Sequence, residues 1–197
     1  MHDGTLTRER LIREATKLVE HRGFASTSLS DLLSAADVKK GAFYHHFASK
    51  DDLCLEVLER EKDRFLEWLS RLLDAPTPRE GLERFFRAAL ALHKKRRFIG
   101  GCLFGNIALE TSDTSPRYAE FVEGVFSEWT AKLETVIREG QKASEIRRDV
   151  PPDVLAQVTV AAIEGAIMLS RLRKDDRPMK TTLETLTVLL DQPHKAA

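Results

Sequence analysis

The amino-acid sequence predicts an all-α protein on three observations. Apolar residues recur three and four positions apart in every long segment, which is the spacing of one helix face. No segment alternates apolar and polar residues as a half-buried strand does. Glycine, proline, serine and aspartate separate the periodic segments, at places where these residues cap or break helices. Together these observations predict a chain of helices joined by short loops.

The first helix is expected over residues 7–22. Glycine is the usual residue just past a helix C-terminus, and Gly23 stands there. The apolar residues that define the buried face of this helix are Leu11, Ile12, Ala15, Leu18 and Val19.

Residues 28–46 predict two short helices joined by a tight turn. Ser28 or Thr27 can cap the first helix, and Asp31 stands three residues after Ser28 in the capping-box position. Asp37 stands at the turn, where an aspartate tolerates a left-handed backbone. The second short helix is expected over residues 39–46, and Phe43 and Phe47 share one of its faces because they are four positions apart.

Longer helices are expected in the remainder of the chain. Ser49 caps a helix that runs through about Leu73, with acidic residues in its first turn. The segments with helical spacing that follow are 79–95, 102–110, 116–143, 153–173 and a last short helix marked by Leu183, Leu186, Leu189 and Leu190.

Composition and charge exclude several classes of protein. The chain has 197 residues, is 42% hydrophobic and 31% charged, and has a formal net charge of +0, which is typical of a soluble globular protein. Two distant cysteines predict neither a disulfide framework nor a metal site, and they favour a reducing, cytoplasmic location. The N-terminus lacks a signal peptide, and the apolar run 158–169 is too short to span a bilayer.

The short helices of residues 28–46 fit a helix-turn-helix, whose second helix enters the major groove of DNA. Phe43 and Phe47 would anchor that helix to the first one, at Leu29, Leu32 and Leu33. Lys39, Lys40, Tyr44 and His45 would then project on other faces, and Gly41 would let the backbone approach DNA closely. A tyrosine or helix-cap hydroxyl and a lysine ammonium are suitable phosphate contacts.

The stretch TSLSDLLSAADVKKGAFYHHFASKDDL, residues 27–53, resembles the DNA-binding signature of the TetR family of bacterial transcriptional repressors. Three positions depart from the family pattern: Asp37 replaces a usual glycine, Lys39 a serine and Ala42 a threonine. The resemblance implies contacts with double-stranded operator DNA. The implied phosphate contacts are Thr27, Tyr44 and Lys50. The residues implied to face bases or flanking phosphates are Ser30, Lys39, Lys40 and His45. Ser28, through its cap hydroxyl, and Gly41 are also expected among the DNA-binding residues.

The resemblance further implies a three-helix DNA-binding domain over residues 1–50 and a helical ligand-binding and dimerisation domain over residues 51–197. The expected function is a repressor that a small-molecule inducer releases from its operator. A helical ligand-binding or adaptor protein without DNA binding is the alternative. An enzyme is not expected, because no catalytic or phosphate-binding motif is present. No cofactor or metal is expected either, since the adjacent His45 and His46 point about 100° apart on a helix.

Two helices are expected to form the seam of a twofold homodimer. Small residues in 153–173 allow another helix to approach closely, and segment 116–143 has an apolar face too broad for one neighbour. Together they resemble the four-helix dimer seam of the family. The residues expected in this seam are Phe126, Leu133, Val158, Ala161, Ala162 and Gly165.

An inducer site is expected around Cys102. The glycine-rich stretch 98–110 resembles one in a branch of the family whose members include sensors of electrophiles or small unsaturated compounds. Cys102 is either a small buried side chain or the border of a mostly apolar pocket. The residues expected to line that pocket with it are Phe86, Phe104, Asn106, Trp129 and Met168.

Two charged features have a structural and a functional interpretation. The basic run 94–97 is interpreted either as a solvated helix C-terminus, where cations interact favourably with the helix dipole, or as a nucleic-acid-binding patch. Glu164 lies among small residues in the middle of a helix, where it is expected at a solvated edge or dimer seam, or in a ligand or proton role.

Overall fold

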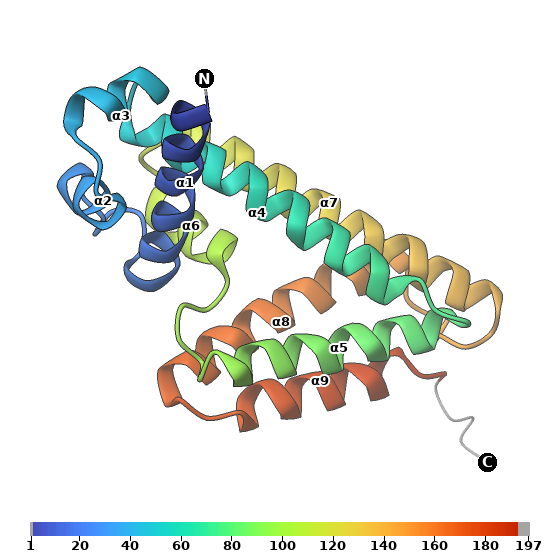
Figure 1. Ribbon diagram of the computed structural model, residues 1–197. Coiled ribbons are helices and arrows are strands. Elements are labelled where there is room, and N and C mark those ends of the chain that lie inside the picture. The colour runs from blue at the N-terminus through green and yellow to red at the C-terminus, as the bar shows by residue number, and fades with distance from the viewer. Residues whose placement is uncertain (1, 193–197) are drawn as a thin grey trace, which may run out of the picture. The chain divides into compact units, whose positions relative to one another are not determined.

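The computed structural model describes residues 2–192, with side chains from Thr5 onward. Within that range the chain forms helices and no strand, which confirms the all-α prediction (Figure 1). The helices are α1 (His2–Arg22), α2 (Leu29–Ala36), α3 (Lys40–His46), α4 (Lys50–Leu73), α5 (Pro78–Lys95), α6 (Leu103–Thr111), α7 (Pro116–Lys142), α8 (Pro152–Arg173) and α9 (Arg177–Leu190).

The chain packs as two compact units. Unit 1 contains the chain up to Arg64 together with Leu103–Val122, and unit 2 contains Phe65–Cys102 and the chain from Glu123 onward. Helices α4 and α7 therefore contribute to both units. This division by packing differs from the expected domain boundary at residue 50, which stays a prediction.

The core of unit 1 holds the first three helices on the start of α4. Leu11, Ile12 and Ala15 of α1 are buried with Leu32 and Ala36 of α2, at the spacing expected from the sequence. Phe43 and Phe47 complete this core from α3, and Leu53 and Val57 complete it from α4. Burial of these side chains is the main stabilising contribution to the unit.

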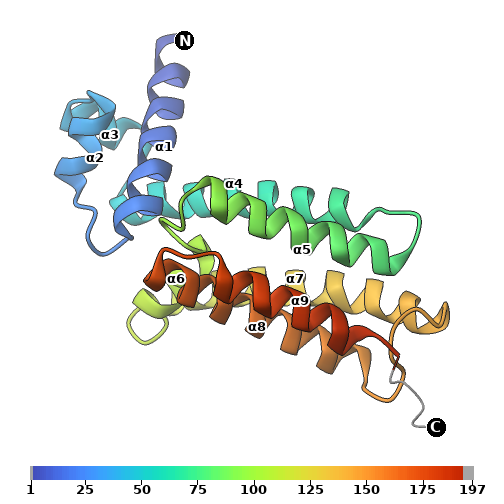
Figure 2. The same ribbon diagram turned by 90° about the horizontal axis from the view of Figure 1, so that it is seen from below.

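The core of unit 2 is larger and rich in aromatic rings. Helices α8 and α9 lie side by side and antiparallel, and α5 packs along α9 (Figure 2). Lys174 ends α8 in a left-handed conformation, and the Ser170 hydroxyl accepts a hydrogen bond from the backbone N–H of Met179 at 3.0 Å. That hydrogen bond fixes the start of α9 against the end of α8.

The apolar run 158–169 lies inside α8, whose bounds agree with the helix expected over residues 153–173. This helix of 22 residues is long and apolar enough to cross a membrane by length and composition alone. A core helix of a soluble protein has the same properties, and eight side chains of α8 are buried in unit 2. The rest of its surface includes exposed apolar residues, which bear on assembly.

Candidate nucleic-acid interface and effector core

The turn between α2 and α3 forms as the sequence predicted. The Ser28 hydroxyl accepts from the backbone N–H of Asp31 at 3.1 Å, and the Asp31 carboxylate accepts from the backbone N–H of Ser28 at 2.9 Å. Asp37 ends α2 at φ 50° and ψ 53°, the left-handed region. Its backbone N–H donates to the carbonyl oxygens of Leu33 and Ser34. This aspartate therefore adopts the turn conformation at the position where the family pattern has glycine.

Helix α3 is held by one face and exposed on the other. Phe43 is fully buried and Phe47 nearly so, with ring centroids 5.9 Å apart, and both belong to the core cluster that contains Leu32. Leu29 and Leu33 pack against that cluster. The predicted anchoring of the second short helix is therefore confirmed.

The exposed face of α3 carries the residues expected to contact DNA. Lys39, Lys40, Gly41 and His45 are exposed, and Tyr44 is 50% exposed. The Lys40 ammonium lies 6.0 Å from the centroid of the Tyr44 ring. Ser28 and Ser30 are exposed at the start of α2. These side chains present cations, hydroxyls and an imidazole to solvent, a set that can donate to phosphates and base edges.

Thr27 does not present its side chain to solvent, contrary to its expected phosphate contact. The residue is 0% exposed, and its hydroxyl donates to the Gly23 carbonyl at 2.7 Å. In this conformation the hydroxyl is used to close the loop between α1 and α2. The sequence could not show this, because a threonine beside a helix cap has the same pattern whether its hydroxyl turns outward or inward.

Lys50 is engaged by the same loop. Its ammonium donates to the carbonyls of Phe24 at 3.1 Å and Thr27 at 2.8 Å, and it lies 4.1 Å from the centroid of the Phe24 ring. An ammonium has three donors, so one remains for a phosphate. Lys50 therefore ties the start of α4 to the loop before α2, whether or not it also contacts DNA.

The loop between α1 and α2 also contacts α6 and α7. The Glu110 carboxylate of α6 accepts from the backbone N–H of Ala25 at 2.9 Å, and a Cβ atom at Gly23 would overlap the same carboxylate. The Tyr118 ring of α7 packs on Phe24 with centroids 4.8 Å apart. Sequence reasoning missed Glu110 and Tyr118, because they lie more than 80 residues along the chain from their partners and no local pattern marks them.

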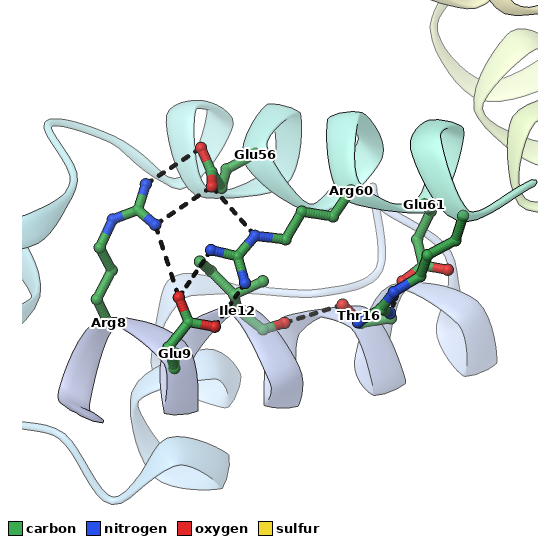
Figure 3. A network of polar contacts seen from close by, with 8 residues as sticks. Arg8, Glu9, Ile12, Thr16, Glu56, Arg60 and Glu61 are labelled. Carbon is green, nitrogen blue, oxygen red and sulfur yellow. Dashed lines mark hydrogen bonds and ion pairs between the residues drawn. The ribbon is translucent and has the colours of Figure 1, made fainter. Parts of the chain in front are cut away.

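A network of ion pairs joins α1 to α4 (Figure 3). Arg60 binds the Glu9 carboxylate with two hydrogen bonds of 2.5 and 2.7 Å, and its Nε donates to Glu56 at 3.2 Å. Arg8 also binds Glu56, at 3.1 Å. These guanidinium groups lower the pKa of both carboxyls. The paired charges attach α1 to α4 in addition to their shared apolar core.

The residues expected around the inducer do not all belong to one unit. Phe86, Cys102, Trp129 and Met168 lie in unit 2, whereas Phe104 and Asn106 lie in unit 1. Phe86 and Trp129 are buried in the core of unit 2, and Cys102 is half-buried against that core. Met168 is 51% exposed on α8, so within this chain it is a surface residue and does not line the core.

Glu164 is partly exposed as a residue, but its carboxyl group lies deeper than at a solvated edge. Its Oε1 atom is shielded from solvent and has no hydrogen-bonding partner among residues 2–192. Burial raises the pKa of Glu164, and a hydrogen bond with the Cys102 thiol partly offsets that effect. No three His, Cys, Asp or Glu side chains in the described part of the chain are grouped as metal ligands.

The expected dimer seam needs two corrections. Leu133 is 0% exposed in the core of unit 2, together with Val125, Trp129 and Ile137, so one subunit already covers the broad apolar face of α7. Instead, a group of exposed apolar residues lies on the adjacent helices α8 and α9. They are Val154, Val158, Met168, Leu169 and Leu172 on α8 and Val188 and Leu189 on α9. Ala161 is exposed among them, Ala162 and Gly165 are partly exposed on α8, and Phe126 of α7 is half-buried beside Trp129.

Two family models match this chain. Residues 11–57 match the model described as bacterial regulatory proteins of the tetR family, and residues 78–186 match the model described as the tetracyclin repressor-like C-terminal domain. The first match contains the whole of α2 and α3, and the second runs from α5 into α9.

Curated relatives and solved structures agree with these models. The chain is 30% identical to the HTH-type transcriptional repressor DhaR of Mycobacterium sp. (strain GP1), over 95% of this chain and 92% of that protein. It is also 30% identical to the transcriptional regulator AcuR of Cereibacter sphaeroides, over 93% of this chain and 84% of that protein.

Among solved structures, a regulatory protein TetR from Rhodobacter sphaeroides has a TM-score of 0.87 at 29% identity and covers 94% of this chain and 99% of its own. The reduced form of Escherichia coli NemR has a TM-score of 0.85 at 26% identity, over 95% and 99% of the two chains. The two family models, the full-length relatives and the exposed, anchored α3 agree, and the chain belongs to the TetR family of bacterial transcriptional regulators.

Proposed function

We propose that this regulator is a cytoplasmic repressor that binds double-stranded operator DNA through α3 and leaves it when a small molecule binds unit 2. The single observation that carries the DNA-binding part is the two-sided construction of α3. Phe43 and Phe47 hold it on a core, while Lys39, Lys40 and Tyr44 remain exposed. The repressor assignment is supported by the name of the relative DhaR, a transcriptional repressor.

The proposed homodimer is formed by α8 and α9 of each subunit. Val154, Val158, Ala161, Gly165 and Leu172 recur at intervals of three, four and seven residues, so they form one stripe along α8. Most of that stripe is apolar and exposed, which is unfavourable in water unless another surface covers it. A twofold dimer covers it with an identical stripe and brings two copies of α3 to one DNA duplex.

DNA binding is tested with the duplex upstream of the chain's own gene against a shuffled duplex of equal length. We expect the wild type to bind the upstream duplex at lower concentration, and Tyr44→Ala to lose most of that affinity while keeping its helix content by circular dichroism. Arg87→Ala is the control, because Arg87 is an exposed cation on α5. Equal binding of both duplexes by the wild type would favour the alternative, a helical ligand-binding protein without an operator.

The proposed effector site is in the core of unit 2, where Cys102 lies half-buried. Cys102 either lines this site or reacts with the effector. N-ethylmaleimide distinguishes these roles, because burial raises the pKa of the other thiol, Cys54, to about 12 and keeps it unreactive near neutral pH. A reactive Cys102 predicts release of DNA by treated wild type and not by Cys102→Ser. Release from both variants, or from neither, leaves the reversible site.

A further inference from the structure

Glu164 is a carboxyl group in the apolar helix α8, and no cation is paired with it among the residues that the structure describes. Its neighbours Ile163, Ala166 and Ile167 are buried in the core of unit 2. Its Oε1 atom is shielded from solvent and has no partner in the described chain. The Cys102 thiol is the hydrogen-bonding group beside it, and a thiol is a weak donor. A buried carboxylate in such surroundings destabilises the fold, so the chain retains it at a cost.

A second polar atom is unpaired in the same core. Trp129 is 4% exposed, and its indole Nε1 has no hydrogen-bonding partner among residues 2–192. Buried indole N–H groups usually find an acceptor. Unit 2 therefore contains a hydrogen-bond acceptor without a donor, Glu164 Oε1 on α8, and a donor without an acceptor, Trp129 Nε1 on α7.

Aromatic rings surround the indole. The ring centroids of Phe65, Phe85 and Phe126 lie 5.2, 6.2 and 5.9 Å from that of Trp129. Phe65 and Phe85 meet the indole edge to face, and Phe126 stacks on it. Aromatic faces attract cations, and a carboxylate without a cation pairs with one.

We propose that Glu164 is the recognition group for an effector that carries a primary ammonium on an apolar body. The ammonium donates to Glu164 Oε1, and the apolar body is accommodated by the aromatic core that includes Trp129. The ammonium of such a ligand is the cation that pairs with Glu164. The protein therefore binds this ligand more tightly than a neutral ligand of the same shape. The inference rests on the proposed regulatory function only for its last step, the release of DNA.

The structure also predicts a cost in stability that accompanies this role. Replacing a carboxyl that is shielded from solvent and has no cation beside it with an apolar side chain of similar size stabilises a fold. We therefore expect Glu164→Leu to melt at a higher temperature than the wild type at pH 7.5, and Glu164→Gln to melt no lower. If both variants melted lower, the carboxyl would have a stabilising partner in the protein, and the proposal would be wrong.

Calorimetric titration of the full chain without DNA tests the recognition itself. The probes are butylamine, benzylamine and 1-naphthylmethylamine at pH 7.5, each against the alcohol of the same carbon skeleton. A charge-assisted hydrogen bond predicts that at least one amine binds about tenfold more tightly than its alcohol. In Glu164→Gln that preference should fall to about twofold or less, whereas the alcohol should bind as before.

Glu128→Gln is the matched control, because Glu128 is an exposed carboxyl on α7 in the same unit. It should keep the wild-type preference. The proposal is overturned if no amine binds the wild type, or if Glu164→Gln binds the amine as tightly as the wild type does. Adding the preferred amine to the protein–DNA complex then tests regulation separately. Binding without release of DNA would reject the effector role and leave the ammonium site standing.

Discussion

At the residue scale, Gly41 is a position where the fold does not require glycine. It lies inside α3 without a left-handed backbone, and a Cβ atom there would meet nothing within 4 Å. Glycine in a helix costs about 0.5–1 kcal/mol relative to alanine, so the chain accepts a less stable helix. The expected close approach of this helix to DNA would account for the glycine.

We therefore expect Gly41→Ala to raise the free energy of unfolding by about 0.5–1 kcal/mol and to weaken DNA binding. Urea denaturation and fluorescence anisotropy with the upstream duplex measure the two effects. Gly124→Ala is the matched control, because Gly124 lies inside α7 and a Cβ atom there also meets nothing within 4 Å. Unchanged DNA affinity in Gly41→Ala would mean that the backbone of α3 does not approach the duplex closely at this position.

A second residue-scale prediction concerns His93, which is buried at the end of α5. Burial, with a smaller effect from Arg96, lowers the pKa of His93 from 6.5 to about 4. The folded state therefore keeps this imidazole neutral, while the unfolded state takes up a proton below pH 6.5. Its contribution to stability is complete above pH 6.5 and is lost as the pH falls towards 4.

The loss corresponds to up to about 3 kcal/mol of the free energy of unfolding. Urea denaturation between pH 7.5 and pH 4.5 measures it, and His93→Gln should show a smaller decrease over the same range. A wild type and a variant with parallel pH profiles would contradict the shifted pKa.

At the element scale, the loop between α1 and α2 depends on α6. Gly23 has a φ of 85°, and a side chain there would overlap the Glu110 carboxylate, which accepts a hydrogen bond from the backbone N–H of Ala25. Gly23→Ala should lower the free energy of unfolding by about 1–2 kcal/mol, because it adds left-handed strain to this overlap.

A double-mutant cycle separates the two causes. Glu110→Ala removes the overlap but not the strain, so Gly23→Ala should cost less in a Glu110→Ala background than in the wild type. The measurement is the midpoint of urea denaturation for all four proteins. Strictly additive changes in the free energy of unfolding would show that Glu110 of α6 does not overlap a side chain at position 23.

The elements also show where sequence reasoning stops. The Asp37 turn, a cap at Thr27 or Ser28 and most helix bounds were predictable, because each depends on neighbours within a few residues. Helix α1 is an exception, since it begins at His2 and not at residue 7. Lys50, Glu110 and the Arg60 network were not, since their partners lie 23 to 85 residues away and any charged residue on a helix has the same local pattern. Leu133 was assigned to a dimer because periodicity identifies an apolar face and not the neighbour that covers it.

At the scale of the whole molecule, assembly is predicted to depend on the stripe along α8. Leu172→Arg places a charge on a residue that is 73% exposed in one subunit, so the subunit should still fold. It should nevertheless shift the protein from dimer to monomer in sedimentation velocity, because the charge would be buried in the dimer. Leu109→Arg is the control, on a leucine of α6 that is 85% exposed. A wild type that sediments as a monomer would contradict the proposed assembly.

The central claim is that exposed cations of α3 contact DNA phosphates in each subunit of a dimer. The most direct measurement is the dependence of DNA affinity on salt for the wild type and Lys39→Ala, from about 50 to 200 mM salt. If Lys39 neutralises one phosphate per subunit, a dimer loses two. The slope of log K against log salt should then become shallower by about 1.8. An unchanged slope, with wild-type affinity for the upstream duplex, would place the DNA contact on another surface of the protein.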